Sequence, residues 1–393
     1  MEQRGVAMIY LDYNATTPVA PDVLEAMLPF LRDGYGNPSS AHSPGRRAHQ
    51  AIEAARSQVA TLIGASPDEI LFTSGGTESS NLAIRGVLLA QPERRHVVTS
   101  AFEHPATAET CRLLERQGTR VTRVAVGRDG RVRPEDVARA LDDGPALVTI
   151  MHANNEIGTI QPIAQISRTA RLKDALVHTD AAQTLGKIPV DVDALGVDLL
   201  TIAGHKLYAP KGIGALYVRR GTALQGLLTG AGHERGLRPG TENVAGIVAL
   251  GKACEIAGRD LVAEQMKLRG LREHLLANLR KNVDGLVLHG HPTERLPNTL
   301  FVSFPGVHGQ RLLDAVPEIA ASTGSACHSG SDAPCASLVA AGLDAAQAVG
   351  PVRLSLGRNT TVREVEEAAQ LLGAAWKRLR QAAGGGKYTR PSA

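Results

Sequence analysis

The chain lacks the segments that would place it in a membrane or on a nucleic acid. Among its 393 residues, no stretch approaches the roughly 18 unbroken apolar residues that a membrane helix needs. The net charge is only +4 and no run of Lys or Arg stands out, so the charge gives no reason to expect nucleic-acid binding. The apolar stretch near the amino terminus is too short for a signal peptide and is interrupted by Asp12. We therefore expect a cytoplasmic protein.

Cysteine is also scarce. Four cysteines in a chain of 393 residues do not make a disulfide framework. No CxxC motif and no Cys/His pair with the spacing of metal ligands occurs, so we expect no zinc site and no other metal. Cys111 and Cys254 lie in helical patterns, where free cysteine packs as a small hydrophobic residue. Cys327 and Cys335 lie together in a loop-like stretch rich in Gly and Ser.

What the sequence does contain is a regular alternation of strand and helix patterns. Between residues 47 and 220, short β-branched runs predict strands at Glu69–Thr73, His96–Ser100, Arg120–Val126, Ala146–Met151, Ala175–Thr179, Asp198–Ala203 and Ile213–Val218. Helical spacing separates most of them, at Arg47–Ile63, Ser79–Ala90, Pro105–Gln117 and Pro162–Leu172. This order predicts an α/β fold with a mostly parallel sheet and helices on both faces.

The pattern changes after about residue 250. A long helix is expected over Val244–Asn282, followed by shorter strands at Asn298–Phe304 and Val352–Leu356 and helices at Gly309–Val316 and Val362–Gln381. A chain of this length exceeds one typical core, so we expect two domains. We assign residues 15–250 to the large domain, residues 1–14 and 251–383 to a smaller α+β domain, and residues 384–393 to a disordered tail.

Unusual polar residues follow the predicted parallel strands, where open α/β sheets bind ligands. Gly75 and Gly76 lie between the first predicted strand and a helix. His104, Asp180 and Lys206 each follow a later strand. Each has an ordinary explanation, as a capping loop, a surface histidine, a helix cap or an outward lysine. Together they match the needs of pyridoxal phosphate (PLP), which takes a lysine, an acid for the pyridine nitrogen and donors for the phosphate.

Ten motifs identify a family. They are YLDYNATTP, GNPSSAHSPGR, FTSGGTESSNLAI, EHPA, MHANNEIGTIQPI, HTDAAQTLGK, GHKLYAPKGIGALYV, HERGLRPGTEN, STGSACHSG and VRLSLGRNTT. The motifs follow one another in the order typical of the cysteine desulfurases. The chain resembles that family over about residues 9 to 372. Its members are PLP-dependent enzymes of fold type I in the class V aminotransferase group. The resemblance implies a homodimer that acts on L-cysteine and passes its sulfur to an acceptor or scaffold protein.

The resemblance also assigns roles to individual residues. Lys206 is the lysine that binds the cofactor, Asp180 holds the pyridinium proton, and Cys327 is the persulfide-forming nucleophile. His104 stacks on the cofactor ring and is a candidate proton acceptor for the Cys327 thiol. The remaining assignments are Gln183 on the ring hydroxyl, Gly76, Thr77 and His205 on the phosphate, Thr241 on the phosphate of the partner subunit, and Asn155 and Arg353 on the substrate carboxylate. Cys335 has no counterpart in the family pattern.

Two features leave alternatives open. Position 203 is Ala, where members that supply iron–sulfur cluster assembly commonly place a Ser that binds the phosphate. The residues around the nucleophile, ACHSG, together with GLRPGTEN, also resemble the selenocysteine lyases. The expected activity is therefore conversion of L-cysteine to L-alanine with persulfide formation on Cys327, and the alternative is release of selenium from L-selenocysteine. An inactive scaffold or a true aminotransferase is disfavoured by the intact Lys206 and Cys327.

Overall fold

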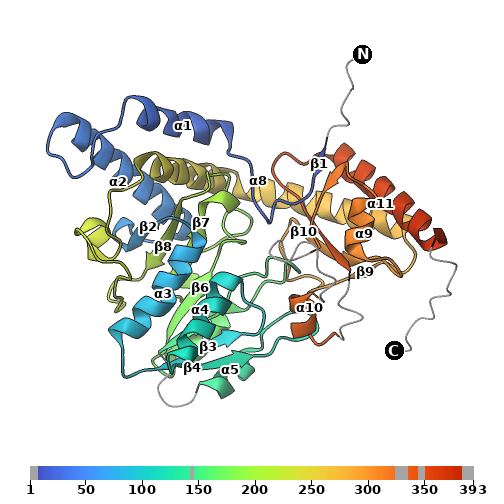
Figure 1. The fold of residues 1–393 in the computed structure, drawn as a ribbon, viewed down its shortest axis with the longest axis horizontal. Coiled ribbons are helices and arrows are strands. Elements are labelled where there is room, and N and C mark those ends of the chain that lie inside the picture. The colour runs from blue at the N-terminus through green and yellow to red at the C-terminus, as the bar shows by residue number, and fades with distance from the viewer. Residues whose placement is uncertain (1–7, 142–145, 324–334, 344–349, 383–393) are drawn as a thin grey trace.

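The structure is a computed structural model that describes residues 8–141, 146–323, 335–343 and 350–382. Figure 1 shows a large sheet covered by helices, with smaller sheets beside it. The first half of the described chain contains β1 (Ile9–Tyr10), α1 (Pro21–Arg32), α2 (Ser43–Ile63), β2 (Ile70–Thr73), α3 (Gly76–Ala90), β3 (His96–Ser100), α4 (Pro105–Arg116), β4 (Arg120–Val124), α5 (Pro134–Ala140), β5 (Leu147–Thr149), α6 (Ile163–Arg171) and β6 (Leu176–Asp180). The second half contains α7 (Val192–Leu195), β7 (Leu199–Ala203), β8 (Gly214–Val218), α8 (Val244–Asn282), β9 (Val287–Leu288), β10 (Thr299–Ser303), α9 (Gly309–Asp314), β11 (Ile319–Ala320), α10 (Ala336–Ala340), β12 (Pro351–Ser355) and α11 (Val362–Ala382).

The large sheet has the strand order β2-β8-β7-β6-β5-β3-β4 in the described part of the chain. All of its strands run in one direction except β8, which is antiparallel to both β7 and β2. Strands β2, β3, β5, β7 and β8 are buried along their whole length, as expected for a sheet covered by helices on both faces. The mostly parallel sheet expected from the sequence is confirmed.

A second group of strands lies beside the large sheet. Strands β12, β10 and β9 form an antiparallel sheet, and β1 pairs in parallel with β11, with Ile9 opposite Ile319. The residues near the amino terminus therefore pack with the carboxyl-terminal part of the chain. Buried side chains of these strands and of α11, Trp376 among them, form a hydrophobic cluster separate from the clusters of the large sheet.

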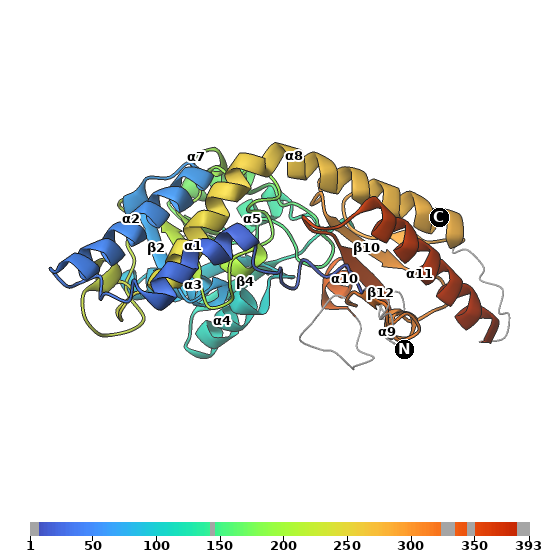
Figure 2. The same cartoon turned by 90° about the horizontal axis from the view of Figure 1, so that it is seen from above.

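Helix α8 connects the two regions. Ile247 to Ala257 belong to the main cluster of the large sheet, whereas Leu268 to Leu279 belong to the second cluster. Figure 2 shows α8 extending across both regions, with α1 and α2 against its first half and α11 along its second half. The boundary expected at residue 250 falls within this one continuous helix. No helix in the described ranges is long and apolar enough to cross a membrane.

Candidate active site

The polar residues noted in the sequence gather at one edge of the large sheet. Because β2, β3, β5, β6 and β7 run in the same direction, their carboxyl ends meet at this edge. Asp180 is the last residue of β6, and Lys206 lies in a 3-10 turn directly after the neighbouring strand β7. The structure thus brings the proposed acid and the proposed cofactor lysine to adjacent strand ends.

The turn between β2 and α3 is shaped to hold an anion. Gly75 adopts φ 150° and ψ −176°, a conformation that L side chains rarely adopt, and an added Cβ on Gly76 would lie 3.2 Å from the Cβ of Ala203. No described side chain caps the first turn of α3, so the backbone N–H groups of Gly76 and Thr77 remain available to an anion. Ala203 closes this side of the turn, which explains why a small residue fits position 203.

Asp180 is a buried carboxylate with one engaged oxygen. Its Oδ1 accepts a hydrogen bond from the backbone N–H of Ala182 at 2.9 Å, and Oδ2 has no hydrogen-bond partner among the described residues. The residue is 8% exposed, and burial raises the pKa of the carboxyl, opposed by the charges of His104 and Lys206. A buried carboxylate in this state needs a donor, and the protonated nitrogen of a pyridine ring is one.

The amine of Lys206 is held by backbone carbonyl groups. Its Nζ donates to the carbonyl oxygens of Asn14 and Ala15, both at 2.6 Å. Burial, and secondly the charge of Arg353, lower the pKa of Lys206 to about 8. A lysine pKa of about 8 leaves part of the amine neutral near neutral pH, as a nucleophile or general base requires.

His104 caps helix α4. Its Nδ1 accepts a hydrogen bond from the backbone N–H of Ala106 at 3.1 Å, and Pro105 occupies the first position of the helix. Burial lowers the pKa of the imidazole, with the charge of Asp180 acting in the opposite direction. Because Nδ1 is an acceptor here, the neutral ring carries its proton on Nε2. His104 therefore offers a donor, and it can accept a proton only if Nδ1 releases the Ala106 N–H.

One of the two proposed substrate residues, Arg353, comes from a different part of the fold. Arg353 lies in the middle of β12, is 2% exposed, and binds Asp12 with an Nη2–Oδ1 distance of 2.7 Å. Its Nη1 donates to the carbonyl oxygen of Asn155 at 3.0 Å, which joins the small sheet to the loop after β5. The side-chain amide of Asn155 has no hydrogen-bond partner among the described residues and is half-buried.

Gln183 and a second buried lysine lie in the turn after β6. The Nε2 of Gln183 donates to the carbonyl oxygen of Asn14 at 3.0 Å, and its Oε1 accepts from the Nζ of Lys187 at 3.0 Å. Both side chains are buried. The structure places Gln183 beside Lys206 through their common acceptor, the carbonyl group of Asn14.

Two predicted phosphate contacts differ in their surroundings. His205 precedes Lys206 and its Nδ1 lies 3.2 Å from Oγ1 of Thr16; burial lowers the pKa of His205 to about 4. Thr241 is exposed and no hydrogen bond within the described chain ties it to this edge of the sheet. An exposed position agrees with a contact to a second subunit, the role that the resemblance gives to Thr241.

The two cysteines of the carboxyl-terminal loop cannot be treated alike. Cys327 lies outside the described residues. Cys335 is 9% exposed, and its Sγ donates to Oε2 of Glu156 at 3.2 Å. Burial raises the pKa of the Cys335 thiol, so this cysteine is held as a thiol and is unsuited to nucleophilic attack. Cys111 and Cys254 are buried free cysteines, as expected.

Three residues of the site were not predicted from the sequence. Asn14 is 1% exposed, and its amide nitrogen donates to Oγ1 of Thr299 at 2.9 Å and to the carbonyl oxygen of Asn155 at 3.2 Å. Glu103 accepts from the N–H of Met151 at 3.1 Å, and burial raises its pKa to about 8. Lys187 is the third. All three lie inside the family motifs, but their burial and their contacts at the site come from the fold.

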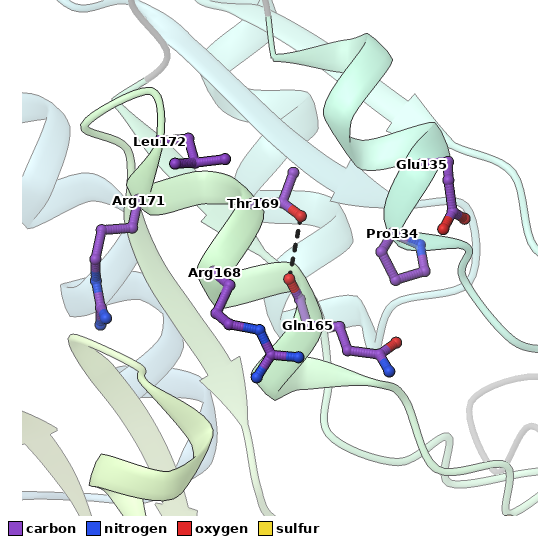
Figure 3. A pocket seen from close by; sticks show the side chains of 7 residues that line it. All are labelled: Pro134, Glu135, Gln165, Arg168, Thr169, Arg171 and Leu172. Atoms are coloured by element: carbon purple, nitrogen blue, oxygen red, sulfur yellow. Dashed lines mark hydrogen bonds between the residues drawn. The ribbon is translucent and has the colours of Figure 1, made fainter.

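A hollow on the surface lies away from these residues. Figure 3 shows it between α5 and α6. Its lining residues are Pro134, Glu135, Gln165, Arg168, Thr169, Arg171 and Leu172. It has a volume of about 680 Å³, and none of the strand-end residues lines it. Arg168 and Arg171 point in different directions in the view, and Leu172 is 84% exposed. This hollow lacks the convergent polar groups of the sheet edge.

Comparison with known proteins gives a consistent family. A family model described as Aminotransferase class-V matches residues 9–368. A cysteine desulfurase IscS from Dictyoglomus turgidum is 46% identical over 375 residues, which cover 95% of both chains. A cysteine desulfurase IscS from Anaeromyxobacter sp. is 48% identical over 377 residues, covering 95% of this chain and 93% of that protein.

Solved structures agree with the sequence relatives. A NifS-like protein superposes with a TM-score of 0.88 at 39% identity and covers 95% of this chain and all of its own. A structure described as SspA in complex with cysteine has a TM-score of 0.79 at 37% identity and covers 88% of this chain. The chain belongs to the class V aminotransferase family, and the fold of PLP-dependent enzymes of type I expected from the sequence is confirmed. Enzymes of this family depend on PLP, and the anion-binding turn, the buried Asp180 and the Lys206 amine fit that cofactor.

Proposed function

We propose that this protein is a PLP-dependent cysteine desulfurase that converts L-cysteine to L-alanine and transfers the sulfur to Cys327 and then to an acceptor. The single observation that carries the chemistry is the placement of Lys206 and Asp180 at adjacent strand ends, beside the uncapped start of α3. The class and substrate are supported by the extent of the match to curated cysteine desulfurases.

Each residue has a task that its surroundings favour. Bound PLP supplies an electron sink for the negative charge that develops on the substrate α-carbon. Asp180 holds a proton on the ring nitrogen, and Gly76, Thr77 and His205 bind the phosphate. Lys206 holds the cofactor and, once free, moves the α-proton, for which a pKa of about 8 is suitable.

The sulfur step belongs to Cys327. Its thiolate forms a bond to the substrate sulfur as the carbon–sulfur bond breaks, and the carbon fragment takes up protons and leaves as alanine. The structure supports a donor role for His104 through Nε2, rather than the acceptor role expected from the sequence, because Nδ1 already binds the Ala106 N–H. Gln183 is proposed to bind the ring oxygen, and Asn155 and Arg353 to bind the substrate carboxylate, to which Arg offers a two-point match.

The experiment that tests this step uses both candidate substrates. Cys327→Ala should lose essentially all alanine production from cysteine and keep a measurable fraction from selenocysteine, because a selenol is a better leaving group than a thiol. Cys335→Ala is the matched control, since its buried thiol is held by Glu156. Wild-type rates on cysteine in Cys327→Ala would refute the persulfide mechanism. A strong preference of the wild type for selenocysteine would favour selenocysteine lyase, which the ACHSG motif keeps as the second candidate.

We also propose a homodimer in which Thr241 completes the phosphate site of the partner. The segment before Thr241 is fixed by the fork of Arg56, which binds both carboxylate oxygens of Glu234 at 2.7 and 2.9 Å. Glu234 and Arg235 both have positive φ values, 46° and 58°, so this ion pair holds a strained turn. Sedimentation should show a dimer, and a fully active monomer would contradict the assignment.

The remaining proposals concern division and location. We propose residues 15–250 as the cofactor domain and residues 1–14 and 251–383 as the smaller domain. The separate hydrophobic clusters support a division into two domains, and the main cluster extends past the proposed boundary to Ala257. A cytoplasmic location is supported by the three described cysteines, all of which are free and buried. Release of sulfur from cysteine is supported by the name of the relatives, cysteine desulfurase. We propose iron–sulfur cluster assembly or thiolation as the destination of that sulfur.

A further inference from the structure

Lys187 is a buried lysine for which the reaction described above has no use. It is 8% exposed and its Nζ donates 3.0 Å to Oε1 of Gln183. In the described ranges it forms no ion pair with a carboxylate. Burial first, and then the charges of Lys206 and Arg353, lower its pKa to about 7. Burying an amine beside two cations opposes folding, so packing alone does not account for a lysine here.

The turn that carries Lys187 is fixed by close packing. Gly186 has φ +72°, and an added Cβ would lie 2.3 Å from Cδ1 of Leu207 and 3.2 Å from the Cβ of Ala257. The turn therefore packs directly against the residue after Lys206 and against α8. The backbone N–H of Lys187 donates to the carbonyl oxygen of Thr184 at 3.0 Å. This packing fixes the backbone from which the Lys187 side chain extends.

Two contacts settle the orientation of the Gln183 amide. The backbone carbonyl of Asn14 only accepts, so Nε2 of Gln183 faces it, and Oε1 faces the Lys187 amine, which can donate whether or not it is protonated. The same carbonyl oxygen accepts from Nζ of Lys206 at 2.6 Å. A continuous chain of contacts thus runs from Lys187 through Gln183 and Asn14 to Lys206.

We propose that Lys187 is a positioning residue for the reaction: it turns the amide hydrogens of Gln183 toward Asn14 and the cofactor, and it places a positive charge behind that contact. The inference rests on the proposed roles of Gln183 and Lys206. In the loaded enzyme Lys206 carries no ammonium, so Lys187 lacks this like-charged neighbour whenever the link between lysine and cofactor is unprotonated. The other titratable or charged groups that act on this pair are Asp12, His104, Asp180, His205 and Arg353.

Three substitutions separate the hydrogen bond from the charge. Lys187→Met removes both, Lys187→Gln keeps a donor without the charge, and Lys187→Arg keeps both. Two quantities are measured: the dissociation constant of PLP from the full-length protein, and the pH midpoint of the absorption band of the bound cofactor. A nearby cation disfavours protonation of the link between lysine and cofactor. We therefore expect the pH midpoint to rise by roughly one pH unit in Lys187→Met and in Lys187→Gln.

The affinity for PLP should separate these three variants in a different way from the pH midpoint. Losing one hydrogen bond predicts PLP binding about fivefold to tenfold weaker in Lys187→Met, with Lys187→Gln and Lys187→Arg close to the wild type. Lys173→Met, which replaces an exposed lysine, should change neither quantity. The proposal would be overturned if Lys187→Met and Lys187→Gln kept the wild-type PLP affinity and pH midpoint and differed only in melting temperature. Lys206→Ala tests the proposed function itself: if that variant keeps the cofactor band, the assignment of Lys206 fails, whatever Lys187 does.

Discussion

The two main sheets contribute to the candidate site in different ways. The large sheet places Asp180 and Lys206 at strand ends, where the chain leaves the sheet and its side chains face a common edge. The small sheet contributes Arg353 from the middle of β12, opposite Phe301 of β10. The first region is organised by backbone turns and the second by a buried side chain fixed by Asp12. The comparison predicts that changes at Asp180 and Lys206 affect the rate of the chemical step and that changes at Arg353 affect substrate binding.

The largest effect is expected from Lys206→Ala. Loss of a proton-transferring group lowers rates by about 10²–10⁴-fold, and the absorption band of the lysine-bound cofactor should disappear as well. The measurements are alanine production and the visible spectrum after reconstitution with PLP. Lys173→Ala is the control, because its side chain is exposed and lies outside the sheet edge. If the wild-type protein could not be reconstituted with PLP, the assignment of the sheet edge as a PLP site would be wrong.

Asp180→Ala should have the second largest effect. We expect the rate of alanine production to fall roughly 10²–10³-fold and the cofactor occupancy to fall much less. The carboxylate matters most when negative charge develops on the substrate, because it keeps the ring nitrogen protonated. The rate is compared with the fraction of PLP bound in the same preparation. Equal losses of rate and occupancy would mean that Asp180 only holds the cofactor.

How far the sequence predicts the site depends on whether a residue lies at a strand end of the large sheet or within a strand of the small sheet. Polar residues after parallel strands predict a ligand-binding edge, so Asp180 and Lys206 were found by pattern and their gathering is confirmed. Arg353 lies within an apolar strand, where pattern alone indicates only a buried position, and it was assigned by family resemblance. Asn14 was missed because its contacts join residues far apart in the sequence, such as Asn14 and Thr299. Lys187 contacts Gln183 only four residues away, and what the sequence does not show is that this lysine is buried.

Arg353→Lys should act on substrate binding. Replacing the planar fork by a single ammonium removes one charge-assisted hydrogen bond, and a value of about 1.5–3 kcal/mol for that bond predicts KM raised roughly tenfold to 150-fold. The rate at saturating cysteine and the cofactor spectrum should stay near the wild type, and steady-state kinetics distinguish the two. A fall in the maximal rate with unchanged KM would place Arg353 with the chemistry and end the distinction between the sheets.

The smallest effect concerns stability in acid and compares one buried histidine from each sheet. Burial lowers the pKa of His178 in β6 to about 3 and that of His289 beside β9 to about 4. His178 bonds Thr149 and Thr201, and His289 bonds Ser303. Both folded-state pKa values lie below the unfolded value of about 6.5, so the folded chain binds fewer protons and stability falls as pH drops below 6.5.

Between pH 7 and pH 5, each such histidine should cost about 2 kcal/mol of folding free energy. Replacing either histidine by Gln should remove its contribution to this loss of folding free energy. The size should not depend on which sheet carries the histidine, because burial and not the reaction lowers its pKa. Urea unfolding of the PLP-free protein at both pH values measures this for His178→Gln and His289→Gln, with the exposed His49→Gln as the control. If only His178→Gln reduced the pH dependence of the unfolding free energy, we would infer that the small sheet opens before the unfolding transition and exposes His289 to water. The two regions would then differ in stability as well as in their contribution to the site.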